Sequence, residues 1–182
     1  MHKRAAKDMD NSANPPPQTL GVLNQLRRNS RINKHQHFCA GERNHFYNGV
    51  FGSVAIVINV FLGSLLFVTV TETLPEIARW ISAFLAMLAA ACGGIQTFFN
   101  FQKVFEGHRK IANRYLDIQR ECERVIALFT DNLIDTERLA NEVDVISKEY
   151  GRVNTDAEVF PTGDRDFRKA IACENDKSGS PP

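Results

Sequence analysis

Two histidines and a cysteine lie close together in residues 35–39, as His35, His37 and Cys39. Imidazole nitrogens and thiolates are the groups that bind zinc in proteins, and a closed zinc site needs four ligands. His45 is the only loose candidate nearby for the fourth position, and the spacing matches no familiar zinc motif. We therefore expect no metal site here and no cofactor.

Catalytic patterns are missing from the rest of the sequence. There is no glycine-rich phosphate loop and no nucleophile paired with a base. The carboxylates of the C-terminal part, such as Glu121, Glu123, Asp135 and Glu137, are expected on solvated helix faces, where they form no catalytic pair. We predict that the protein is not an enzyme, and we expect no nucleic-acid partner.

Four polar residues, Asn59, Gln96, Thr97 and Asn100, lie within or at the end of otherwise apolar runs. A polar group in hydrocarbon is costly unless it finds a hydrogen-bond partner or water. One interpretation is that these residues line a water-filled path when several copies cluster. The alternative is that they form hydrogen bonds that only hold helices together.

The apolar runs that surround these residues are long enough to cross a membrane. Residues 44–71 contain no Asp, Glu, Lys or Arg, and neither do residues 80–102. At about 1.5 Å per helical residue, each run spans the roughly 30 Å of a bilayer core. We place the spans at about 50–70 and 77–99, and the short turn between them forces an antiparallel hairpin. The predicted fold class is an all-α membrane protein built on this two-transmembrane-helix hairpin.

The charge distribution predicts the orientation of the hairpin. Residues 1–49 contain eight Lys or Arg and three acidic residues, and residues 100–115 contain four and one. The turn together with Arg79 contains one basic and two acidic residues. Because basic residues stay on the cytoplasmic side, both termini are predicted to be cytoplasmic in a multi-pass protein of the inner (plasma) membrane, with lipid as a partner.

The composition divides the chain into five segments. Residues 1–19 are expected to be a disordered tail, and residues 20–47 a basic amphipathic segment along the inner membrane surface. The hairpin occupies residues 48–101. A cytoplasmic helical region follows over residues 102–152, and residues 153–182 are expected to be mostly loop.

The apolar pattern continues beyond the second span with alternating spacings of three and four. This seam predicts that the second span extends as one long cytoplasmic helix and that copies of the chain assemble through it. A further tail helix is expected from Thr136 to a stop near Gly151. The predicted oligomerisation residues are Phe101, Val104, His108, Ile111, Tyr115, Ile118 and Cys122.

Two features of this pattern have alternative explanations. A stripe of small residues in the second span, which includes Ala89 and Gly93, permits close helix approach either between copies or within one hairpin. His108 lies on the seam, where it is either a buried neutral histidine or a pH sensor.

The hairpin, the second tail helix and the stretch at residues 108–121 resemble the SLATT family, the SMODS- and SLOG-associating two-transmembrane effector domains of prokaryotic conflict systems. The stretch contains Ala112-x-x-Tyr115-x-x-apolar-x-Arg120-Glu121, and the resemblance covers roughly residues 38–160. It implies an oligomeric effector that forms or gates a pore in an anti-phage, abortive-infection type of system. A separate sensor or nucleotide-signalling protein would trigger it.

Two other functions are compatible with the same sequence. The hairpin could be a non-conducting anchor for a tail that recruits a partner, or a packing subunit of a membrane enzyme. An anchor has no need for polar residues such as Asn59 and Gln96 within its spans, so the role of these amides distinguishes an effector from an adaptor.

Overall fold

The structure, a computed structural model, describes residues 18–69 and 75–178, and helix is the only regular secondary structure among them. This confirms the all-helical fold class and the presence of two helices long and apolar enough to span a membrane. The expectations for residues 1–17 and for the turn at residues 70–74 lie outside the described part. The helices are α1 (Gln18–Thr69), α2 (Glu76–Phe99), α3 (Phe101–Thr130), α4 (Thr136–Ala157) and α5 (Asp164–Ser178).

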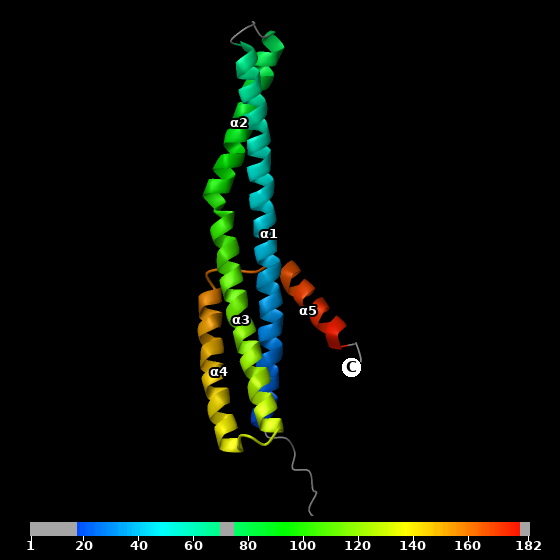
Figure 1. The fold of residues 1–182 in the computed structure, drawn as a ribbon, viewed down its shortest axis with the longest axis vertical. Helices are drawn as coiled ribbons and strands as arrows, with labels where there is room; N and C mark the ends of the chain where they lie inside the picture. Colours follow the sequence, from blue (N-terminus) through cyan, green and yellow to red (C-terminus); the bar gives the residue numbers. More distant parts are fainter. Residues whose placement is uncertain (1–17, 70–74, 179–182) are drawn as a thin grey trace, which may run out of the picture.

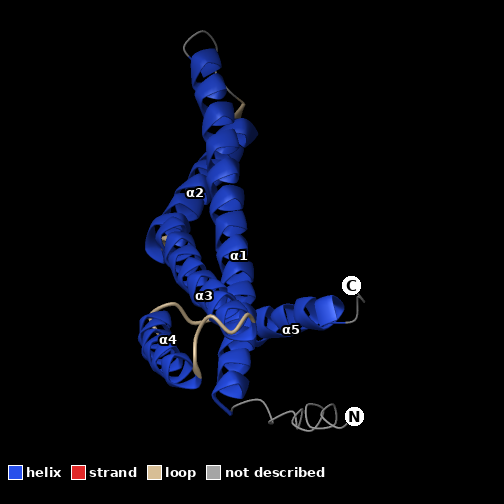
Figure 2. Ribbon diagram, turned by 60° about the horizontal axis from the view of Figure 1, so that its bottom comes forward, coloured by secondary structure: helices blue, strands red, loops and turns tan. Residues whose placement is uncertain are grey.

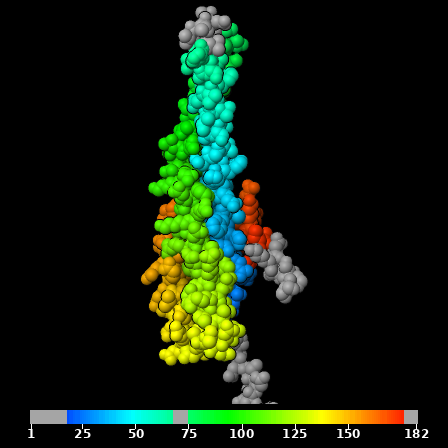
Figure 3. Space-filling view, viewed as in Figure 1, coloured from blue at the N-terminus to red at the C-terminus, as the bar shows by residue number. Residues whose placement is uncertain are grey.

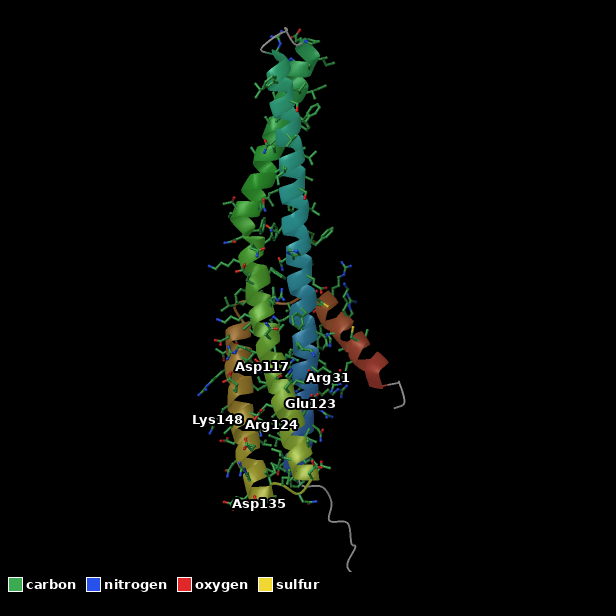
Figure 4. The ribbon with its side chains drawn as sticks, viewed as in Figure 1. Arg31, Asp117, Glu123, Arg124, Asp135 and Lys148 are labelled. Carbon is green, nitrogen blue, oxygen red and sulfur yellow. The ribbon has the colours of Figure 1, made fainter. Side chains whose placement is uncertain are left out.

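One helix, α1, runs the whole length of the molecule and connects two unlike halves (Figure 1). We call residues 50–69 of α1 together with α2 the apolar half. Residues 18–49 of α1 together with α3, α4 and α5 form the polar half. The space-filling view shows a slender column of two helices that widens where α4 and α5 join it (Figure 3). The charged side chains labelled in Figure 4 all lie in the wider part.

The hairpin returns through α2 and then α3, with one break at Asn100. This residue has left-handed backbone angles, φ 44° and ψ 49°. Its backbone N–H donates to the carbonyl of Gln96, and its own carbonyl accepts from Val104. Asn100 therefore closes α2 and opens α3. The expected single helix through this point is two helices joined at one residue, a conformation that asparagine tolerates better than most residues.

Residues 20–47 are not a separate helix on a membrane surface, because they belong to the uninterrupted α1. Leu23 and Ala40 are fully buried. Leu20 and Leu26 are partly buried against the same core as Leu23. At spacings of three residues, these leucines share one helix face, and that face packs on protein.

The C-terminal part also differs from the expectation. Gly151 does not stop the fourth helix, which continues to Ala157 and buries Val153 completely. A glycine inside a helix costs only about 1 kcal/mol relative to alanine, which the burial of an apolar side chain offsets. The tail expected to be mostly loop contains α5, which projects from the bundle beside α1 (Figure 2).

The core lies in the polar half, where α1, α3 and α4 meet. The buried cluster comprises Leu23, Ile111, Tyr115, Ile118, Cys122, Val125, Leu139, Val143, Ile146 and Val153. The start of α4 is fixed by a side-chain cap. Asp135 accepts a hydrogen bond of 2.8 Å from the backbone N–H of Arg138.

Candidate functional site

The surface of the apolar half is the largest candidate site. Ala89 and Cys92 are its only buried side chains among residues 50–67 and 76–99. Large apolar side chains such as Phe67 and Phe98 are 84% and 82% exposed. A chain that leaves so much apolar surface uncovered requires an apolar surrounding or further protein to cover it.

Asn59 lies exposed on this surface, and its side chain makes no hydrogen bond with any other described residue. Its amide has two donors and one acceptor oxygen, and none of them is satisfied within the described chain. Among the three predicted polar residues that lie within the spans, Asn59 is the one whose side chain makes no hydrogen bond with another described residue, so it still needs an outside partner.

Gln96 has a partner inside the hairpin. Its amide nitrogen donates to the side-chain oxygen of Asn48 at 2.8 Å. Gly52 makes room for this contact, because a Cβ at that position would lie 3.3 Å from the Gln96 amide nitrogen. Of the two interpretations offered for these residues, this contact matches a hydrogen bond that holds helices together, and it forms within one hairpin. Asn48, at the edge of the polar half, was not singled out from the sequence.

Asn100 bonds through its backbone at the break described above, and its exposed side chain makes no hydrogen bond with another described residue. The Thr97 hydroxyl is satisfied locally, because it donates to the carbonyl of Gly93 in its own helix at 2.9 Å. This back-bonding to the preceding turn is the usual way for a helix to satisfy a hydroxyl without help from outside.

The seam predicted to join copies of the chain is buried within one chain. His108, Ile111, Tyr115, Ile118 and Cys122 are between 0% and 5% exposed. Parts of α1 and α4 contribute to the same core cluster and cover this face of α3. Heptad spacing identified a buried helix face correctly, but the partner comes from the same chain.

The upper end of the seam has a different environment. Phe101 and Val104 are only partly buried. The Phe101 ring stacks against Phe51, with ring centroids 5.9 Å apart, and against Phe99 at 5.5 Å. This aromatic group lies where the apolar half begins, so it packs the two helices of the hairpin together.

A buried pair of histidines joins α1 to α3. The Nδ1 atoms of His37 and His108 are 3.0 Å apart, and the two residues are 5% and 2% exposed. At this distance one nitrogen donates and the other accepts, so the contact exists only when at least one ring is neutral. Phe160 covers the pair from the loop before α5, with its ring centroid 5.8 Å from that of His108.

Both imidazoles are held neutral by their surroundings. Burial, and then the proximity of His108, lowers the pKa of His37 to about 4. Burial, and then the charge of Arg43, lowers the pKa of His108, while Asp166 acts in the opposite direction on both rings. Of the two interpretations offered for His108, the buried neutral histidine matches this geometry.

The potential metal ligands of residues 35–39 diverge in the structure. A helix turns 100° per residue, so positions two apart point to opposite sides. His37 faces α3, while Cys39 lines a cavity shared with α5. His45 packs on the Phe105 ring at 4.9 Å between centroids. Among the described residues, no group of three or more His, Cys, Asp or Glu side chains is placed to hold a metal.

Sequence reasoning missed the attachment of α5 to α1. Asp166 is 2% exposed and accepts two hydrogen bonds from the Arg43 guanidinium, at 2.7 and 2.8 Å. A backbone N–H from Gly163 also donates to this carboxylate, at 3.1 Å. Further along, Glu174 pairs with Arg31 at 3.2 Å, so α5 runs antiparallel to α1. The two aspartates of the first turn, Asp164 and Asp166, were the available signal for a helix start.

Comparisons with protein-family models, with curated proteins and with solved structures find no match for this chain.

Proposed function

We propose that the protein is a two-span membrane effector that self-associates through its apolar half and forms or gates a pore. The polar half lies in the cytoplasm and receives the trigger from a separate sensor or nucleotide-signalling protein. The resemblance to SLATT domains is the reason for assigning it to a prokaryotic conflict system of the anti-phage, abortive-infection type.

The observation that carries the proposal is the exposed apolar surface of the hairpin, which contains the side-chain amide of Asn59 without a hydrogen-bond partner among the described residues. Apolar side chains are favourable in lipid, so the exposed phenylalanines and valines fit a membrane environment. An amide is unfavourable there unless it meets another copy or water. In a ring of hairpins, equivalent Asn59 side chains form a polar collar at one depth, and such a collar can line an aqueous path.

A leakage assay tests the pore. Purified protein in dye-filled liposomes is clustered with an antibody against a C-terminal tag, and we expect release of the dye. Asn59→Leu should abolish release while membrane content and oligomer size stay the same. The matched control is Ser64→Leu, because the Ser64 hydroxyl already bonds the carbonyl of Val60 at 2.9 Å. Leakage by the Asn59 variant at the wild-type level would remove this residue from the pore.

A second candidate is a non-conducting adaptor, in which the hairpin only anchors the helical bundle. The pairing of Gln96 with Asn48 favours it, because this amide no longer requires a water-filled path. The burial of the α3 seam favours it as well, since no assembly through that face is needed. If clustered wild-type protein never leaks, the pore proposal fails and the adaptor is left.

The orientation is tested by labelling. Single cysteines at Thr73 and Ser178, in a variant without the native cysteines, should react with an impermeant maleimide from opposite sides of the membrane. Labelling of both sites from the same side would overturn the proposed hairpin topology.

A further inference from the structure

A cavity of about 360 Å³ lies between α1 and the first two turns of α5. It is distinct from the exposed surface of the hairpin, and it forms where the ion pairs Arg43–Asp166 and Arg31–Glu174 hold α5 beside α1. Its lining is polar and charged, with aromatic side chains at one end. The lining residues are Cys39, Glu42, Arg43, Phe46, Tyr47, Arg165, Asp166 and Lys169.

The charges of this cavity leave a positive excess. The bidentate pair of Arg43 and Asp166 neutralises itself, and Gly163 supplies one more donor to the aspartate. Arg165 and Lys169 are exposed and face a single acidic side chain, Glu42. Neither of these two cations forms an ion pair with another described residue. The net charge of the remaining groups, two positive and one negative, is +1.

The cavity lies directly beside the start of the apolar half. Phe46 and Tyr47, which line it, are 64% and 42% exposed, and Val50 begins the apolar surface. Three residues of helix correspond to about 5 Å, so the cavity is at headgroup depth if the apolar half is in hydrocarbon. Exposed aromatic side chains favour the same depth.

We propose that this cavity binds the phosphate of an anionic phospholipid, with Arg165 and Lys169 as its cationic ligands and the acyl chains along the exposed rings of Phe46 and Tyr47. The inference rests on the proposed membrane location of the hairpin. A basic pocket beside an apolar span is the arrangement that recognises anionic headgroups, and the aromatic rim gives the lipid an advantage over free phosphate.

The test uses the full chain in micelles of an uncharged detergent, titrated with dioctanoyl phosphatidylglycerol and followed by native mass spectrometry. We expect one tightly retained lipid. Arg165→Gln and Lys169→Gln should each weaken its affinity about fivefold, the usual effect of one basic residue near an anionic surface. The matched control is Arg168→Gln on the same helix, because Arg168 does not line the cavity. Circular dichroism verifies that each variant keeps its helix content.

Three outcomes would overturn the proposal: equal affinity in all three variants, equal binding of dioctanoyl phosphatidylcholine, or binding of glycerol phosphate as tight as that of the lipid. The last result identifies a site for soluble phosphates. Membrane insertion is measured separately, by resistance of the expressed protein to alkaline extraction. If alkali extracts the protein from the membrane, the proposed membrane function fails, whatever the lipid titration gives. A failure of the proposed function is therefore distinguishable from a failure of the lipid site.

Discussion

The two halves of α1 have the same secondary structure and opposite surroundings. In the polar half, Leu23 and Ala40 are fully buried against other helices of the chain. In the apolar half, Ile56 and Val57 are 65% and 67% exposed. The more apolar end of the helix is thus the less buried one, which is the reverse of a water-soluble protein. Burial within the chain follows the two-faced pattern of residues 18–49, while the uniformly apolar part of α1 leaves most of its described side chains exposed.

The polar groups of the two halves are satisfied in different ways. In the polar half they reach across helices: Asn33 donates to the Tyr150 hydroxyl at 3.1 Å, and Tyr115 donates to Asn154 at 2.7 Å. In the apolar half, hydroxyls bond inside their own helix: Ser82 donates to the carbonyl of Ala78 at 2.8 Å. Gln96 is the exception, because its amide reaches across to Asn48. Hydroxyls that are satisfied within one helix suit a solvent without hydrogen-bonding groups.

The largest expected effect comes from placing charge in the polar half. Ile111→Asp combined with Ile118→Asp buries two carboxylates without partners, and we expect a loss of several kcal/mol that unfolds the bundle. Limited proteolysis and thermal melting in detergent measure this loss. The control is Val145→Asp, whose side chain is 62% exposed on α4 and which should melt like wild type.

This experiment also separates two explanations of the seam. If the double variant kept its native melting curve and only became monomeric, the seam would join copies of the chain. Loss of the protease-resistant bundle is expected if the seam packs on α1 and α4 of the same chain.

The next effect is pH dependence, and it belongs to the polar half alone. The pKa of His37 is lowered from about 6.5 in the unfolded chain to about 4, so the unfolded state binds more protons between these values. Stability is therefore highest above pH 6.5 and falls as the pH drops, by about 3 kcal/mol for this residue. Thermal midpoints at pH 7, 5.5 and 4.5 measure the fall. His37→Asn with His108→Asn should flatten the curve, and an unchanged slope would contradict the neutral pair.

Gly107→Ala tests how closely the polar half is packed. A Cβ at Gly107 would overlap with ring carbons of Phe160, so this ring must move. We expect a loss of about 1–3 kcal/mol. Gly151→Ala is the matched control: it is also in a helix, no atom lies within 4 Å of its Cβ, and it should stabilise by about 0.5–1 kcal/mol. Equal melting of the two variants would show that Phe160 does not pack on Gly107.

The smallest effect is expected in the hairpin. Leu substitutions of Asn48 and Gln96, singly and together, form a double-mutant cycle for the bond at 2.8 Å. Interhelical hydrogen bonds in membrane proteins contribute about 0.6 kcal/mol on average, so we expect a coupling energy of that order. Unfolding in mixed micelles measures it. A coupling of zero would return Gln96 to the set of residues available to a neighbouring copy.

The features predicted from sequence were those that leave a pattern among residues close together along the chain. Charge-free runs locate the two long apolar helices, and the three-and-four spacing identifies Ile111, Tyr115 and Ile118 as one buried face. The partner of that face has no such signature, because the side chains that join α1 to α3 are far apart in the sequence: His37 and His108 are 71 positions apart, and Lys34 and Gln119 are 85 positions apart. The pairs His37 with His108 and Arg43 with Asp166 depend on this folding back, so neither was predicted.

Helix ends were predicted less well where tertiary contacts overrule local preference. The low helix propensity of Gly151 predicts a helix end there. The helix continues beyond it, because Val153 is fully buried and its packing stabilises the additional turns. The charged sequence of α5 suggests a loop by composition. The buried carboxylate of Asp166 attaches it to α1 through Arg43, and Glu174 pairs with Arg31 further along.

The continuity of α1 has a mechanical consequence. A helix of 52 residues without proline is a rod of about 78 Å that resists bending and twisting along its whole length. The helical segment that returns from the hairpin is interrupted at Asn100, where a single left-handed residue separates α2 from α3. We therefore expect rotation of the base of α1 to be transmitted to its far end, while a change in the angle between α2 and α3 requires new backbone angles at Asn100 alone.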